Sequence, residues 1–157
     1  MMNQMNYGIF AVMGAFFIFF FLIGIAMYVL GALGLYTMAQ RRQLENAWVA
    51  WVPVAQLYIL GKLIQSLRIG SFEVPQIELV LPGLAVAGVF LGMIPVIGQI
   101  VALVSMVVSL FALYKLFSMY RPDQATLYLI LSIVLPFMGP VFIFLMRNDT
   151  PVYSESF

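Results

Sequence analysis

The sequence predicts an all-α membrane helix bundle, built as one domain over residues 1–157 from four transmembrane segments and one interfacial or re-entrant amphipathic helix. Hydrophobic residues make up 64% of the chain and charged residues only 8%, against about 25% in an ordinary soluble domain. Seven basic and six acidic residues cannot cover a soluble core this apolar. The composition therefore excludes a soluble globular protein, a disordered chain and a nucleic-acid-binding protein.

Missing residue types exclude several kinds of chemistry. The chain contains no cysteine and no histidine, which removes thiol nucleophiles, thiolate metal sites, the commonest general base and the commonest metal ligand. No residue that is charged at neutral pH lies within 9–40 or 79–114, whereas proton-coupled transporters usually place one inside the bilayer. We therefore expect no enzyme activity, no catalytic residue, no metal ion and no cofactor.

Four stretches have the length and apolarity of a transmembrane helix, which needs about 20 residues. They cover residues 9–33, 77–96, 99–117 and 125–146. The first holds the aromatic run Phe16–Phe21, which we interpret as lipid-facing bulk. Because Met1–Asn6 has no basic residue and the apolar run is too long for a signal peptide, we expect an uncleaved anchor.

Prolines interrupt the predicted helices. Pro136 and Pro140 lie in the middle of the last stretch, which therefore either crosses the bilayer fully or turns back as a hairpin. An apolar residue precedes each of Pro53, Pro95 and Pro136, at spacings of 42 and 41 residues. This repeated pattern of an apolar residue before proline is typical of broken membrane helices, which often line transport sites.

Residues 46–67 differ from the four spans because they hold Pro53 and several polar side chains. A helix that begins at Pro53 would gather its polar side chains on one broad face. Trp48 and Trp51 are residues that favour the headgroup level of a membrane. This pattern predicts an interfacial or re-entrant element, followed by a short polar loop at Ile69–Glu78.

The basic residues predict the orientation. With the N-terminus outside and residues 46–67 not crossing, six of the seven basic residues fall on the cytoplasmic side, as the positive-inside rule requires. A hairpin at Pro136 would add Arg147 as the seventh and would place the C-terminus on the same side. We expect the membrane-interface anchors to be Arg41, Arg42, Trp48, Trp51, Tyr58, Lys62, Arg68, Lys115 and Arg121.

Small residues mark a predicted helix-packing face. Gly88 and Gly92 form a GxxxG motif, whose small side chains let two helices approach closely. The motif packs either within the monomer or against a second copy. Gly24, Gly31 and Gly34 in the first span allow the same two interpretations.

The polar residues of the predicted helices also have two interpretations. Gln56, Gln99, Ser105 and Ser109 either form hydrogen bonds between helices or line a polar path for a substrate. In the second case all four would face one water-filled cavity.

One segment is similar to a known motif. The stretch from Trp48 through Trp51, Pro53 and Tyr58 to Lys62, in the pattern WxxWxPxxxxYxxGK, resembles small integral membrane proteins without an assigned activity, found mostly in Gram-positive bacteria. Later parts of the chain support the resemblance, which covers residues 36–151. Gln56 stands where the family pattern has asparagine. The resemblance implies a bacterial cytoplasmic membrane and a four-helix organisation.

From these observations we expect a non-enzymatic membrane subunit or scaffold, surrounded by the lipid bilayer and packed against a larger membrane complex or against copies of itself. The alternative is a small oligomeric transporter or channel whose proline-broken helices line the path. A third hypothesis, an enzyme acting on lipid, requires a polar cluster at the headgroup level. Its candidates are Tyr58, Lys62, Arg121 and Asp123.

Overall fold

The computed structural model describes the backbone of residues 4–152 and the side chains of residues 8–152. Residues 1–3 and residues 153–157, at the end of the predicted polar tail, lie outside the described residues. Helices dominate the described part. They are α1 (Gln4–Arg41), α2 (Gln56–Ile64), α3 (Ile77–Leu91), α4 (Ile97–Tyr120), α5 (Ala125–Val134) and α6 (Met138–Leu145), with the 3₁₀ turns η1 (Ala47–Trp51), η2 (Pro122–Gln124) and η3 (Met146–Asn148). This confirms the all-α fold class.

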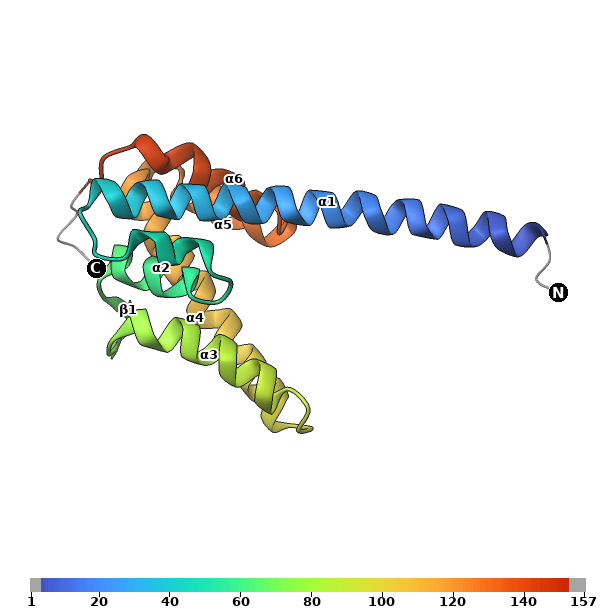
Figure 1. Cartoon of the computed structure of the whole chain (residues 1–157). Helices are drawn as coiled ribbons and strands as arrows, with labels where there is room; N and C mark the ends of the chain where they lie inside the picture. Colours follow the sequence, from blue (N-terminus) through green and yellow to red (C-terminus); the bar gives the residue numbers. More distant parts are fainter. Residues whose placement is uncertain (1–3, 153–157) are drawn as a thin grey trace.

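Helix α1 is a long rod whose first half projects beyond the rest of the molecule (Figure 1). It has 38 residues, which correspond to about 57 Å at the usual rise per residue. Every side chain from residue 8 to residue 26 is exposed, and we call this segment the free half of α1. The second half packs against α6 and η1.

The rest of the chain forms three helical hairpins, η1–α2, α3–α4 and α5–α6. Each starts near the end of the molecule at which α1 ends, and each returns to that end (Figure 1). Side-chain contacts connect the helices at that end. Arg42 donates a hydrogen bond to the Leu63 carbonyl, and Arg121 Nε lies 2.7 Å from Asp149 Oδ2. Pro53, Pro95 and Pro136 occupy the three turns.

The four predicted transmembrane segments are not confirmed. In the described chain, two helices are long and apolar enough to cross a membrane, residues 8–41 of α1 and the whole of α4. Helix α3 has 15 residues and ends at Leu91. Residues 125–146 form a hairpin rather than one crossing helix, because the backbone leaves the helix at Leu135 and proline at position 136 has no N–H for a helical bond.

Within the element predicted over residues 46–67, the structure has two pieces, η1 and α2, joined by a turn at Pro53. Helix α2 begins at Gln56, three residues after the predicted start. The predicted polar loop at residues 69–78 is partly wrong, because two short antiparallel strands, β1 (Leu67–Ile69) and β2 (Phe72–Val74), pair across its start. Gly70 allows the tight turn between them, since its φ is +63°, a conformation that costs little only for glycine.

The core lies where the second half of α1 meets α2, α4 and the α5–α6 hairpin. Its centre is an aromatic cluster. Tyr128 and Phe142 stack with ring centroids 4.1 Å apart, and Phe117 contacts both rings edge-on. Ile59 and Leu63 of α2 are fully buried beside this cluster's helices. Within the described residues, no polar or charged residue is buried, so apolar packing and backbone hydrogen bonds hold the bundle.

Candidate functional site

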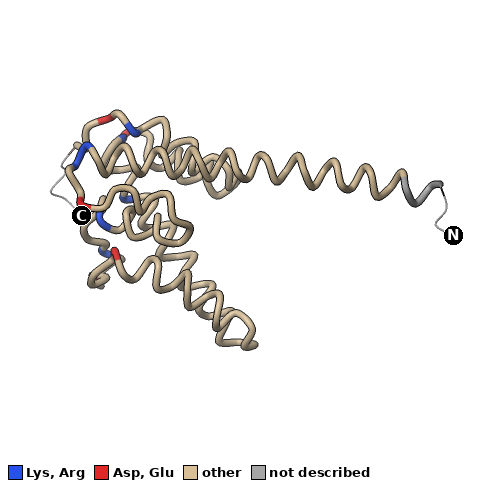
Figure 2. The backbone as a smooth tube through the Cα atoms, in the orientation of Figure 1, with Lys and Arg blue, Asp and Glu red and all other residues tan. Residues whose placement is uncertain are grey.

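All charged residues of the described part gather at one end of the molecule, around the point where α1 ends (Figure 2). We call it the charged end. It holds all seven basic residues of the sequence together with acidic partners from the connecting segments. The charged residues are Arg41, Arg42, Glu45, Lys62, Arg68, Glu73, Glu78, Lys115, Arg121, Asp123, Arg147 and Asp149.

At the charged end, the side chains of Arg121 and Lys115 contact segments that are far away in the sequence. Arg121 bridges to Asp149, and its Nη1 also donates to the Tyr128 hydroxyl at 3.1 Å. The hydrogen bond to Asp149 raises the pKa of Arg121 above its ordinary value. Lys115 Nζ donates to the carbonyl and to the hydroxyl oxygen of Ser66. These contacts connect the open ends of the α3–α4 and α5–α6 hairpins. The predicted anchors Lys115 and Arg121 therefore also have a structural role.

The predicted aromatic anchors lie on the η1–α2 hairpin. Trp48 is exposed, whereas Trp51 contacts the Tyr36 ring and its carbonyl accepts a hydrogen bond from the Tyr28 hydroxyl. Lys62 Nζ lies 4.9 Å from the centre of the Tyr58 ring. The contact with Tyr58 raises the pKa of Lys62.

The η1–α2 and α5–α6 hairpins, which we call the half-length hairpins, reach a similar level along α1. Trp51 meets α1 at Tyr28, and Pro140, at the start of α6, packs against Gly31 one turn further on. From Tyr28 to Arg41, the end of α1, is about 20 Å at the helical rise. The η1–α2 and α5–α6 hairpins therefore extend about that far from the charged end.

The glycines expected to mediate packing divide into two groups. An added Cβ at Gly34 would lie 2.8 Å from Ile143 Cγ2, so Gly31 and Gly34 let α6 approach α1 closely. By contrast, a Cβ at Gly24 or Gly88 would meet open space within the described chain, and one at Gly92 would contact only its own helix. Gly92 nevertheless packs within the monomer, because a Cβ added at Gly98, in the first turn of α4, would lie 2.9 Å from the Gly92 Cα. Within the GxxxG motif, Gly88 is therefore the glycine that stays open.

The four predicted polar-path residues lie on two hairpins. Gln56 begins α2 and is half-buried, whereas Gln99 is exposed in the first turn of α4. Ser105 and Ser109 lie one turn apart on α4 and are half-buried. None of the four lines the cavity described below.

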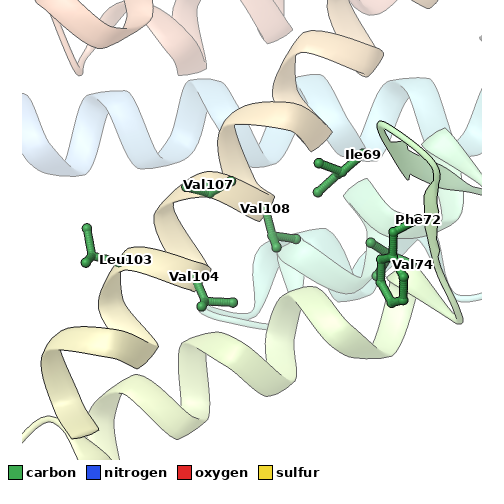
Figure 3. Close-up of a pocket in the computed structure, with 7 residues that line it drawn as sticks. All are labelled: Ile69, Phe72, Val74, Leu103, Val104, Val107 and Val108. Carbon is green, nitrogen blue, oxygen red and sulfur yellow. The ribbon is translucent and has the colours of Figure 1, made fainter. Parts of the chain in front are cut away.

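The cavity has a volume of about 380 Å³ and lies between α4 and the two short strands (Figure 3). All seven lining side chains are apolar: Ile69, Phe72, Val74, Leu103, Val104, Val107 and Val108. Sequence reasoning missed this feature because residues 69–78 were expected to be a polar loop. The alternation in Phe72-Glu73-Val74 was the available signal, but three residues are too few for a clear strand pattern.

Exposed apolar side chains cover the outer surfaces of the helices. Phe17 in the free half of α1 is 72% exposed, and Val89 on α3 is 69% exposed. Further examples on α3, on the turn that follows it and on α4 and α5 are Phe90, Met93, Ile97, Leu103, Met106, Leu127, Ile133 and Val134. A surface of this kind needs lipid or another protein to cover it.

The residues considered for enzyme chemistry do not form one cluster. Tyr58 and Lys62 contact each other on α2, while Arg121 pairs with Asp149 beside α5. Within the described chain, no group of three or more Asp, Glu, His or Cys side chains could hold a metal ion.

No protein-family model matches this chain, and no curated protein or solved structure is detectably similar to it.

Proposed function

We propose that this protein is a non-enzymatic accessory subunit or scaffold of a bacterial cell membrane, which holds a partner membrane protein or a second copy of itself through the free half of α1. The α3 face around Gly88 is a second contact surface. The bundle of hairpins serves as the base from which α1 extends.

The length of α1 carries the proposal. Residues 8–41 form 34 consecutive helical residues of high apolarity, about 51 Å in length, whereas the hydrocarbon layer of a bilayer is about 30 Å thick. Even a tilt of about 40°, the upper end of the usual range, shortens its reach only to about 39 Å. A stretch of apolar helix therefore extends past the hydrocarbon layer into the headgroup region unless another protein covers it.

The charged end supports a definite orientation. If it lies at the cytoplasmic surface, all seven basic residues satisfy the positive-inside rule, and the N-terminus lies outside. Helix α1 then crosses the bilayer, while the hairpins enter from the cytoplasmic side and return to it. The resemblance of the Trp48–Lys62 segment to small bacterial membrane proteins supports the bacterial cytoplasmic membrane.

Site-specific photo-crosslinking tests the proposal. A photoreactive amino acid replaces Phe17 in the full-length protein, and a matched variant carries it at Val134, which is 68% exposed on α5. After irradiation of intact cells, we expect the Phe17 variant to give a discrete protein adduct, identified by mass spectrometry as a partner or a second copy. The Val134 variant should give lipid adducts. Lipid adducts alone at both positions would show that α1 has no protein partner.

A transporter or channel is the second candidate, and the two half-length hairpins favour it. Their turns reach α1 one helical turn apart, at Tyr28 and Gly31, and transport sites are often built where broken helices meet inside a membrane. Simultaneous replacement of Gln99, Ser105 and Ser109 by apolar residues tests it. Unchanged solute flux in reconstituted vesicles would contradict this candidate.

A further inference from the structure

We propose that the cavity between α4 and the two short strands binds an acyl chain of an anionic phospholipid, with the lipid phosphate held at Lys115. The inference rests on the membrane location proposed above. It adds a specific lipid ligand to a protein whose other contacts with lipid are general ones.

The walls of the cavity fit an acyl chain. All lining side chains are apolar, and two of them are largely exposed at its edges, Phe72 at 65% and Leu103 at 63%. The residues from α4 form one wall, and those from the strands form the other (Figure 3). The volume of about 380 Å³ lies in the range of small-ligand sites, about 300–1,000 Å³.

A positive charge lies in line with the cavity. Val104, Val108 and Lys115 are spaced by four and seven residues on α4, so they share one face of the helix. Seven residues correspond to about 10 Å along the axis. An acyl chain lying in the cavity would therefore have its headgroup near the Lys115 ammonium, at the charged end.

Lys115 has capacity for a phosphate oxygen. An ammonium group has three N–H donors, and two of them go to Ser66. Arg68 lies on β1 beside this point and pairs with Glu73 at 3.6 Å, with both side chains 58% exposed. Lys115, Arg68 and Glu73 together carry one net positive charge, which favours an anionic headgroup over a zwitterionic one.

Lipid binding to the purified full-length protein tests this site. The protein is offered phosphatidylglycerol and phosphatidylcholine in equal amounts, and the retained lipid is measured by native mass spectrometry. We expect wild type to retain one phosphatidylglycerol preferentially. Loss of one basic residue near the headgroup in Lys115→Gln should weaken this binding about fivefold, and Lys115→Arg should restore it. Val107→Trp should block both lipids by filling the cavity.

Two matched variants act as controls. Arg41→Gln removes a positive charge at the charged end, and Val89→Trp adds the same bulk on exposed α3; both should bind lipid as wild type does. Equal retention of the two lipids by wild type, or an unchanged preference in Lys115→Gln, would overturn the site. Vesicle flotation separates this from the proposed function: a protein that fails to float contradicts the membrane location, whereas one that floats without lipid preference contradicts only the lipid site.

Discussion

Two valines hold the strained turns of the first two hairpins. Val54 and Val96 have φ angles of +68° and +69°, which β-branched residues rarely adopt. At each turn the residue after valine donates its backbone N–H to the carbonyl of the preceding proline at 2.8 Å, as Ala55 and Ile97 do. Both are γ-turns with a strained central residue. The repeated pattern of an apolar residue before proline therefore corresponds to a shared turn geometry at Pro53 and Pro95.

Replacing the strained valine by glycine should stabilise the fold. Val96→Gly removes the Cβ that opposes positive φ, a strain of about 1 kcal/mol or more, and the thermal unfolding midpoint in detergent should rise by about 2–4 °C. Val52→Gly is the matched control, because Val52 has ordinary extended backbone with φ of −91°. There the added flexibility should lower the midpoint. A fall of similar size in both variants would contradict strain at Val96.

At the scale of elements, the contact between α1 and α6 decides how the last hairpin packs. Apolar surface gives little driving force between helices in lipid, so close packing at small residues matters more there. Gly31 and Gly34 provide such a surface for Pro140 and Ile143. At the open ends of the hairpins, Lys115 contacts Ser66 and Arg121 contacts Asp149.

A larger side chain at Gly34 should separate these two helices. The backbone of Ile143 and Phe144 lies 2.9 Å from the position of an added Cβ, so rotation of a side chain cannot relieve the clash. We expect Gly34→Leu to destabilise the protein by about 1–3 kcal/mol, measured as a lower thermal midpoint. Gly24→Leu, where a Cβ meets open space, should leave the midpoint unchanged or slightly raised. If the two variants behave alike, α6 does not pack on Gly34.

At the scale of the whole molecule, the separation of charge from apolar surface is the dominant feature. The hairpins open at the charged end, and the free half of α1 extends away from it (Figures 1 and 2). Because charged side chains are costly inside a bilayer, this arrangement has one favourable placement at a membrane. In the orientation proposed above, the charged end lies in water or among headgroups, and the hairpin turns point into the lipid.

Cysteine labelling tests this placement. Because the chain contains no cysteine, each introduced cysteine is the one thiol of the protein that can react. Single cysteines replace Gly8 at the start of α1, Ser71 between the strands and Asn148 after α6. A membrane-impermeant maleimide applied to intact cells should label Gly8→Cys only. Ser71→Cys and Asn148→Cys should react only after permeabilisation. Labelling of Asn148→Cys in intact cells would mean that residues 125–146 cross the membrane.

Local features of the sequence predicted much of the fold. The helices were predicted from apolar runs, and breaks in them were predicted at Pro53, Pro95 and Pro136 from the fixed φ and missing N–H of proline. Helix α1 continues past the predicted end at residue 33 because Leu35, Met38 and Ala39 are buried in the core. The strand pair at Leu67–Val74 was missed, since each strand has only three residues.

By itself, the sequence determined the properties that each segment carries alone: helical character, high apolarity, the positions of the proline breaks and the grouping of basic residues near helix ends. The tertiary structure alone decided that residues 125–146 turn back, that Gly34 packs while Gly88 stays open, and that Val108 and Phe72 line one cavity. The physical reason is separation along the chain. These features depend on contacts such as Arg121 with Asp149, which no local periodicity encodes, because the two residues meet only after the helices have packed.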